Sequence, residues 1–232
     1  MVDIEAVYIP RKGDSQDMRV TAIIPAHNEE KRIATVIRVL KPLAVIDELV
    51  VVDDGSTDET SKAAKEAGAD VIRLEKNRGK ASAMDEGVKR TNGKIILFLD
   101  ADLLNLKERH VMDLLRPVLD GESEMTMGVF RNGRFRTDIA HRISPGLSGQ
   151  RAMLRKVWDS LDPKRSMDEI GYGIEEELQA LVKDGKVTLK KVILDGVSQY
   201  TKEEKLGPQK GFKLRMKMYR DIINVWTRPF KS

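Results

Sequence analysis

Apolar and polar residues alternate along the first hundred residues in blocks that predict buried strands and amphipathic helices. The short apolar runs that predict strands are 19–24, 48–52, 69–74 and 94–99. The segments with apolar residues at helical spacing are 29–41, 56–68 and 80–91. Strands that alternate with helices join through right-handed crossovers. The pattern therefore predicts an α/β fold with a parallel sheet and helices on both faces.

Local signals suggest where the first two helices begin and end. Pro42 is expected to stop the first helix. The sequence from Ser56 to Glu59 has the spacing of a capping box, which predicts Ser56 as the N-cap of the second helix. Gly68 is expected to end that helix in a left-handed conformation.

The second half of the chain has a less regular pattern. Residues 107–119, 148–160 and 173–184 predict helices, residues 124–130 a strand, and residues 186–194 an edge strand. No repeat or low-complexity linker interrupts the chain, so a single domain is expected. Its regions are a polar lead-in over 1–18, a first half over 19–130, a second half over 131–210 and an amphipathic basic helix over 211–232.

Composition narrows the classes of protein that remain. Hydrophobic residues make up 41% of the 232 residues, enough for a buried core. The absence of cysteine excludes disulfides, thiol catalysis and cysteine-bound zinc. A net charge of +4 suits phosphate-bearing ligands or an anionic membrane surface, but is too small to indicate a nucleic-acid partner. No signal peptide or apolar run of spanning length is visible, so a cytoplasmic location is expected.

Polar clusters follow three of the predicted strands. They are Pro25 to Glu29, Asp53 to Ser56, and Asp100 to Asp102. Asp53 and Asp54 could simply cap a helix, and the later aspartates could be solvated loop acids. Their joint placement instead favours one ligand site, because the carboxyl ends of parallel strands share an edge. One or two carboxylates with diphosphate oxygens form a typical site for Mg²⁺ or Mn²⁺.

Cations stand directly before the third helix, in the sequence Asn77-Arg78-Gly79-Lys80. A glycine there permits close backbone approach, and a helix N-terminus favours anions. Arg78 and Lys80 could also be ordinary surface cations. Because these cations accompany the acidic clusters, the sequence from Asn77 to Lys80 is predicted to bind phosphate.

Together these motifs closely resemble family-2 glycosyltransferases of the GT-A fold, over about residues 20–130. The resemblance implies a Rossmann-like, mostly parallel sheet and a UDP- or GDP-sugar donor. It implies that Asp54 holds the base, that Asp102 is the main ligand of Mg²⁺ or Mn²⁺, and that Asp100 meets ribose or metal. The residues expected to bind the nucleotide-diphosphate sugar are Pro25, Ala26, Asn28, Glu29, Asp54, Arg78, Lys80, Asp100 and Ala101.

Two segments of the second half resemble acceptor-binding motifs. Residues 144–151 are similar to the acceptor loop of polyprenyl-phosphate sugar transferases and glucosyl-3-phosphoglycerate synthases, which implies acceptor contacts from Gly149, Gln150 and Arg151. Residues 171–175 resemble the Gly-Tyr-Gly-x-Glu segment of the phosphoglycerate-using enzymes. Glu175 is then a candidate acceptor base, with Glu176 and Glu177 as alternatives, although acids at a helix start also favour the dipole.

One position departs from the resemblance. Related enzymes often carry a metal-binding histidine after a Gly-Val step, whereas here Gly196-Val197 is followed by Ser198 and Gln199. No histidine occurs after His141. Gln199 or water is therefore expected to complete the metal's coordination.

The sequence thus predicts a metal-dependent hexosyltransferase with Asp102, Lys80 and Glu175 as catalytic residues. The expected acceptor is a small phosphorylated molecule or a polyprenyl phosphate, and inversion or retention stays open. The alternatives are a nucleotide-sugar-binding regulator without turnover and a related nucleotidyltransferase. The basic helix over 211–232 could pack on its own domain, join a homodimer, or bind the inner face of a membrane peripherally.

Overall fold

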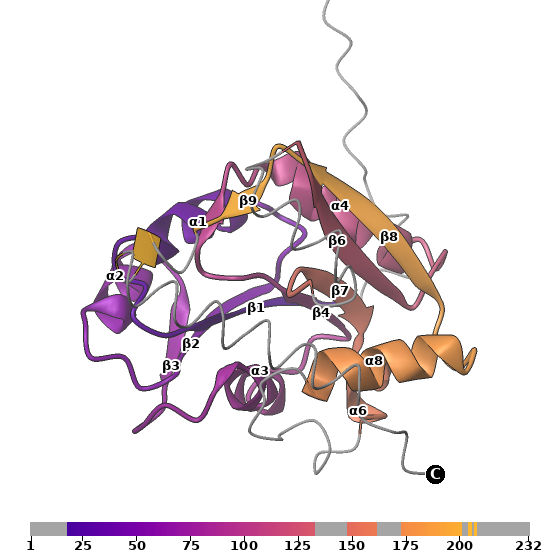
Figure 1. Cartoon of the computed structure of the whole chain (residues 1–232), viewed down its shortest axis with the longest axis horizontal. Helices are drawn as coiled ribbons and strands as arrows, with labels where there is room; N and C mark the ends of the chain where they lie inside the picture. The colour runs from indigo at the N-terminus through magenta and orange to yellow at the C-terminus, as the bar shows by residue number, and fades with distance from the viewer. Residues whose placement is uncertain (1–17, 133–147, 162–172, 201–203, 206, 208–232) are drawn as a thin grey trace, which may run out of the picture.

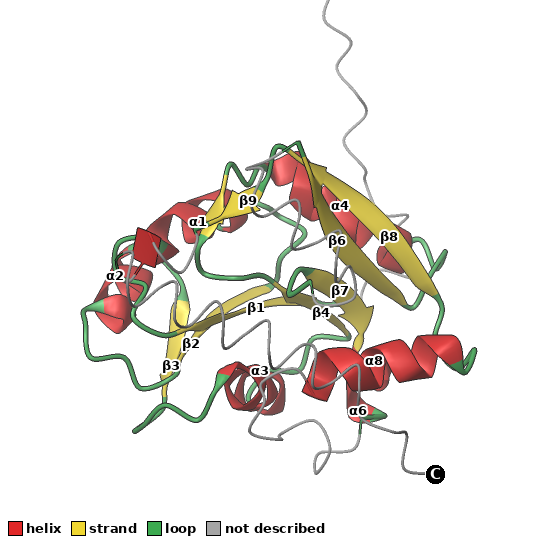
Figure 2. Cartoon of the chain, viewed as in Figure 1, coloured by secondary structure: helices red, strands yellow, loops and turns green. Residues whose placement is uncertain are grey.

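The computed structural model describes residues 18–132, 148–161, 173–200, 204–205 and 207, which form an α/β domain (Figures 1 and 2). Its strands are β1 (Val20–Ala26), β2 (Glu48–Asp53), β3 (Asp70–Arg73), β4 (Ile95–Phe98), β5 (Leu103–Leu104), β6 (Met125–Arg131), β7 (Arg151–Leu154), β8 (Leu189–Asp195) and β9 (Ser198–Gln199). Its helices are α1 (Ile33–Leu40), α2 (Thr60–Glu66), α3 (Lys80–Lys89), α4 (Glu108–Leu119), α6 (Arg155–Asp159) and α8 (Gly173–Lys183).

The main sheet has the strand order β3-β2-β1-β4-β7-β6-β8. The first four of these strands are mutually parallel, as the sequence predicts, with Ile23 of β1 paired to Val50 on one side and Phe98 on the other. β7 runs antiparallel to both β4 and β6, while β6 and β8 are parallel. The chain reverses its direction across the sheet between β1 and β4, the position where ligands bind in open sheets of this kind.

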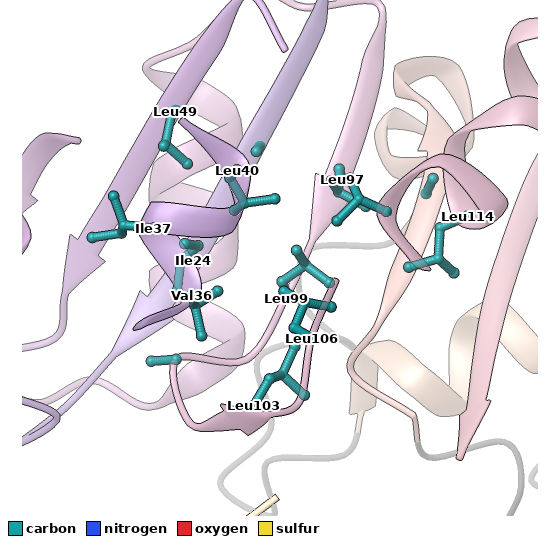
Figure 3. Packing of buried hydrophobic residues seen from close by; sticks show 14 of the residues in the cluster. Ile24, Val36, Ile37, Leu40, Leu49, Leu97, Leu99, Leu103, Leu106 and Leu114 are labelled. Carbon is teal, nitrogen blue, oxygen red and sulfur yellow. The ribbon is translucent and has the colours of Figure 1, made fainter. Parts of the chain in front are cut away.

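Helices cover both faces of the sheet, which confirms the predicted layers (Figure 2). On one face, α1 and α4 pack with residues such as Ile24 and Val51 in a buried cluster, part of which Figure 3 shows. On the other face, α3, α6 and α8 pack with Ile23, Val50 and Val52. Successive residues of β1 and β2 thus point into opposite clusters, which is why these strands are apolar throughout.

The first two helices begin later than the pattern predicts. α1 starts at Ile33 after a turn in which the carbonyl of Glu29 accepts the N–H of Arg32. α2 starts at Thr60, and the predicted capping box at Ser56 is wrong. The Ser56 hydroxyl instead accepts the N–H of Asn28, which links two loops. Gly68 follows α2 with a φ of 95°, as expected for its end.

The predicted helix over 148–160 is also wrong in its first half. Residues 151–154 form β7, which supplies backbone pairing to β4 and β6, and only the short α6 follows. A segment this short between two strands takes its conformation from the ladder bonds on either side rather than from its own pattern. The predicted edge strand is confirmed, since β8 lies at the end of the sheet.

A small antiparallel pair forms above the main sheet from β5 and β9, with Leu103 opposite Gln199. Strands of two residues carry no readable periodicity, so the sequence did not predict them.

No helix in the described part of the chain is long and apolar enough to cross a membrane. Residues 1–17 of the predicted lead-in over 1–18, residues 144–147 of the acceptor loop and the basic helix over 211–232 lie outside the described residues.

Candidate functional site

The loops after β1 and β2 meet at the carboxyl edge of the sheet and are tied together by hydrogen bonds. The N–H of Asp54 donates to the carbonyl of Ala26 at 2.8 Å. Asn28, at a φ of 57°, accepts the N–H of Thr57 on its side-chain oxygen at 2.8 Å. The N–H of Glu29 donates to the Thr60 hydroxyl at 2.8 Å. These bonds fix Asn28 and Glu29 next to the start of α2.

Asp53 and Asp54 have different roles although they are neighbours. Asp53 is fully buried and accepts the N–H of Ser56 and the hydroxyl of Ser61. Burial alone would raise the pKa of Asp53, but these hydrogen bonds and nearby Arg73 lower it below its usual value. Asp53 therefore anchors the start of α2 as an ionised carboxylate.

Asp54 orients the segment that carries the predicted phosphate-binding cations. Its Oδ1 accepts the N–H of Arg78 at 2.7 Å and its Oδ2 accepts that of Gly79 at 2.8 Å. Gly79 has a φ of 91°, a conformation that glycine adopts readily. The Arg78 side chain is exposed and lies 3.9 Å from Glu86. Each Asp54 oxygen keeps a second lone pair for a base N–H.

Asp100 is the centre of the site, because groups from several parts of the chain converge on it. Lys80 Nζ lies 2.5 Å from its Oδ1, Gln150 Nε2 donates to its Oδ2 at 2.6 Å, and the Gln199 amide donates to the same oxygen. Burial alone would raise the pKa of Asp100, but the ammonium of Lys80 and these hydrogen bonds hold it below its usual value. Asp100 is therefore ionised near neutral pH.

Gly149 permits this convergence. A Cβ at Gly149 would lie 2.8 and 2.9 Å from the two carboxylate oxygens of Asp100, and closer still to Lys80 Nζ. Such contacts are too short for a carbon atom, so a side chain at this position would displace the Lys80 ammonium or the Asp100 carboxylate. The predicted acceptor loop thus reaches the predicted donor site at Gly149 and Gln150.

Asp102 lies beside this centre with a partner that the sequence did not predict. Lys205 Nζ is 2.7 Å from Asp102 Oδ2 and 2.6 Å from Glu29 Oε1. Burial raises the pKa of Asp102, as do Asp100 and Glu29, while Lys205 opposes the change. Lys205 stands among other charged residues with no motif around it, so no sequence signal marked it.

Glu175, the predicted acceptor base, belongs to the same charge cluster. It is 7% exposed at the start of α8, whereas Glu176 is exposed, so Glu175 is the inward-facing member of that pair. Burial raises the pKa of Glu175, against the opposing charges of Lys80 and Arg151. A carboxylate with a raised pKa binds a proton more readily, as an acceptor base must.

Arg151 is buried at the start of β7, with 2% of its surface exposed. Its Nε donates to the carbonyl of Ser148 at 2.9 Å, and its Nη1 lies 3.8 Å from the sulfur of Met125. The side chain thus supports the loop that carries Gly149 and Gln150. Contact between Arg151 and an acceptor phosphate stays a prediction.

The remaining predicted residues line the same edge with apolar surface. Pro25 is the penultimate residue of β1 and is partly exposed, while Ala26 and Ala101 are buried in the hydrophobic cluster with α1 and α4. Within the described residues, no group of three or more histidine, cysteine, aspartate or glutamate side chains could hold a metal. Asp100 and Asp102 fit the pattern in which one or two carboxylates, phosphate oxygens and water bind Mg²⁺. The donor set therefore fits a metal held jointly with a diphosphate.

Gln199 occupies the position where related enzymes often have a histidine. Its amide reaches Asp100 from β9, so the side chain belongs to the site. An amide oxygen is an acceptable ligand for a hard cation. Its coordination of metal stays a prediction.

The chain resembles known sugar transferases in sequence. It is 32% identical over 193 residues to glucosyl-3-phosphoglycerate synthase of Mycobacterium tuberculosis strain H37Rv, a match that covers 67% of this chain and 58% of that protein. It is 37% identical over 110 residues to human dolichyl-phosphate beta-glucosyltransferase, covering 40% of this chain and 34% of that one. The chain thus spans little more than half the length of the mycobacterial relative.

The fold agrees with the sequence comparison. The crystal structure of the Mycobacterium tuberculosis synthase with Mn²⁺, UDP-glucose and phosphoglyceric acid superposes with a TM-score of 0.70 at 26% identity, covering 92% of this chain and 82% of that one. Such similarity supports the GT-A fold expected from the motifs. Residues 21–169 match the glycosyl transferase family 2 domain, which includes Asp54, Lys80, Asp100 and Asp102. The chain therefore belongs to glycosyl transferase family 2.

Proposed function

We propose that the chain transfers a hexosyl group, in the first place glucosyl, from a nucleoside-diphosphate sugar to a phosphate-bearing acceptor, with Mg²⁺ or Mn²⁺. One observation carries the proposal: Asp100 is kept ionised by Lys80, Gln150 and Gln199, directly beside Asp102. A regulator that only bound nucleotide would not need acceptor-side residues at this carboxylate.

The first half of the chain binds the nucleotide of the donor. Asp54 accepts a hydrogen bond from the base in a pocket formed by Pro25, Ala26, Asn28 and Glu29. The loop bonds between Asn28, Ser56 and Thr57 support this role, because they hold the pocket in shape before a ligand arrives. Preorganised loops lose less conformational entropy on binding.

The departing diphosphate lies near Asp100 and Asp102 at the N-terminus of α3. Lys80 begins that helix, so its ammonium and the helix dipole favour the negative charge that grows on the leaving group. Arg78 contributes from the preceding segment. When bound by Asp102, with Asp100 beside it, a divalent ion supplies further neutralisation of this charge.

The acceptor is positioned from the second half of the chain. Gly149 and Gln150 bring backbone and amide groups to the site. Arg151 supports them, because its Nε donates to the carbonyl of Ser148 in the same loop. Glu175 orients or deprotonates the acceptor hydroxyl. Its raised pKa, caused by burial, suits a group that must take up and release a proton.

A small phosphorylated acceptor such as 3-phosphoglycerate is the preferred candidate. The sequence match to the mycobacterial synthase extends over 193 residues, whereas the match to the dolichyl-phosphate enzyme extends over 110. The longer match supports a phosphoglycerate-like acceptor. A polyprenyl phosphate is the second candidate. Peripheral membrane contact through 211–232, a homodimer and a cytoplasmic location stay predictions.

Transfer of radiolabel from UDP-glucose tests the proposal directly. The full chain is incubated with Mn²⁺ and either 3-phosphoglycerate or a polyprenyl phosphate, and product is separated from donor. Label should move to 3-phosphoglycerate and should stay on the donor with EDTA or in Asp102→Asn. UDP binding without transfer to either acceptor would instead favour the regulator. Metal-independent turnover in Asp102→Asn would disprove the assigned metal site.

A further inference from the structure

The ammonium of Lys205 lies where two buried carboxylates converge. Its Nζ is 2.6 Å from Glu29 Oε1 and 2.7 Å from Asp102 Oδ2, and its own side chain is 22% exposed. The side chains of Glu29 and Asp102 are each only 9% exposed. Two buried carboxylates at this spacing are unfavourable without a cation. Lys205 provides that cation in the ligand-free protein.

Three acidic side chains of this edge, Glu29, Asp100 and Asp102, are already matched by cations before any metal binds. The pairs are Lys80 with Asp100, Arg32 with Glu29, and Lys205 with both Glu29 and Asp102. A divalent ion placed on Asp102 alone would add two positive charges beside an ammonium in a poorly solvated site. A nucleoside diphosphate carries negative charge that would offset the two positive charges of the divalent ion.

We propose that Lys205 makes divalent-metal binding at Asp102 depend on the nucleoside diphosphate. The ammonium and the metal compete for the same Asp102 oxygen. When the diphosphate is present, its oxygens offer Lys205 an alternative partner and leave Asp102 to the metal. Metal and nucleotide therefore bind with positive coupling, which by linkage is equal in both directions. This inference rests on the proposed function, because it takes Asp102 as the metal ligand.

A second contact joins the end of β9 to the loop after β1. Tyr200, which directly follows β9, lies under the guanidinium of Arg32 at 5.5 Å from the ring centroid. Arg32 in turn donates to Glu29 and to the carbonyl of Asn28. Tyr200 and Lys205 thus each contact a residue that follows β1, Arg32 and Glu29 respectively.

Manganese binding to the full chain tests the competition without reference to turnover. Free Mn²⁺ is followed by electron paramagnetic resonance during titration of wild type, Lys205→Met and Lys190→Met, each with and without UDP. Lys190 is the matched control, since it forms an exposed ion pair with Glu122. Without UDP, Lys205→Met should bind Mn²⁺ roughly 5- to 150-fold more tightly than wild type, while Lys190→Met should not differ. UDP should strengthen Mn²⁺ binding more in wild type than in Lys205→Met.

The outcomes separate this inference from the proposed function. Equal Mn²⁺ affinity of wild type and Lys205→Met in the absence of UDP overturns the competition, even if UDP promotes Mn²⁺ binding in both. Absence of Mn²⁺ binding in every variant with UDP present overturns the proposed metal site as well. Lys205→Gln serves if Lys205→Met does not fold, and Lys205→Arg, which keeps the charge, should behave as wild type.

Discussion

The backbone N–H of Gly79 donates to Asp54 Oδ2 at 2.8 Å, so the carboxylate after β2 fixes the segment that leads into α3. Replacement by asparagine leaves an NH₂ group facing one of the two backbone donors. We expect Asp54→Asn to lower UDP affinity by about tenfold or more, the equivalent of at least roughly 1.4 kcal/mol, and to reduce stability by about 1–3 kcal/mol.

Calorimetric titration with UDP and urea unfolding measure the two effects of Asp54→Asn. Asp85→Asn is the control, because Asp85 forms an i,i+4 pair with Lys89 on the surface of α3. Its stability should change by less than about 0.5 kcal/mol. Unchanged UDP affinity in Asp54→Asn would contradict the role given to this carboxylate.

Substitution of Gly149 should impair transfer more than folding. The new Cβ would displace Asp100 or Lys80, since no space exists between them. A displacement of about 1 Å at a reacting centre can lower the rate by about 100-fold, so kcat/KM for UDP-glucose should fall by this order in Gly149→Ala.

Gly121→Ala is the control for Gly149→Ala, because it should lower stability and leave transfer unchanged. Gly121 has a φ of 71° and open space around its Cα, so alanine is strained there without a clash. It should lose roughly 1–2 kcal/mol of stability and keep its kcat/KM. Similar kinetics in the two variants would show that Gly149 is not required for the arrangement of Asp100.

Gln199→His should strengthen Mn²⁺ binding measured with UDP present. An imidazole nitrogen is a stronger ligand than an amide for transition-metal ions, and Gln199 already reaches Asp100. A gain of roughly tenfold is expected. Gln199→Ala loses the hydrogen bond to Asp100 without this compensation and should bind Mn²⁺ more weakly than wild type. If histidine and alanine gave the same affinity, position 199 would lie outside the metal's coordination shell.

His110 should make the folded protein less stable in mild acid. Its buried ring accepts the N–H of Lys107 on Nδ1 at 3.1 Å, which caps the start of α4. Burial, together with Arg109 and Lys107, lowers the pKa of His110 below its ordinary 6.5. The folded state therefore holds fewer protons than the unfolded state, and stability is complete above about pH 6.5 and falls as the pH drops below it.

Urea unfolding at several pH values measures the contribution of His110. Between pH 7.5 and 5.5, wild type should lose more stability than His110→Gln, whose amide oxygen can accept the same backbone N–H. Parallel pH profiles of the two proteins would show that His110 does not contribute to the acid sensitivity.

The first half of the fold and most of the donor site could be predicted from the sequence. The reason is geometric: when β1, β2 and β4 are parallel, the residues that follow them must share an edge. Asp54 and Asp100 could therefore be placed together without coordinates. The position of β7 could not, because its strand conformation depends on pairing with β4 and β6 rather than on residues 151–154 themselves.

Lys205 is a residue of the site that could not be predicted from the sequence. Its ammonium meets two carboxylates that belong to loops much earlier in the chain, Asp102 and Glu29. A single lysine carries no spacing signal, and its partners are far away in sequence. The start of the second helix was predicted wrongly for a related reason. The Ser56 hydroxyl accepts the N–H of Asn28 in another loop and does not cap the helix that follows it.

The antiparallel direction of β7 decides where the second half of the chain meets Asp100. Because β7 pairs with β4 in this sense, its first residue, Arg151, lies opposite the last residue of β4, Phe98. The chain thus reaches the reaction centre as it enters β7, at a point set by the ladder. The ladder with β4 and β6 therefore sets where Gln150, the residue directly before β7, meets the carboxylate of Asp100. A shift of β7 by one residue along β4 would move the Gln150 amide away from Asp100.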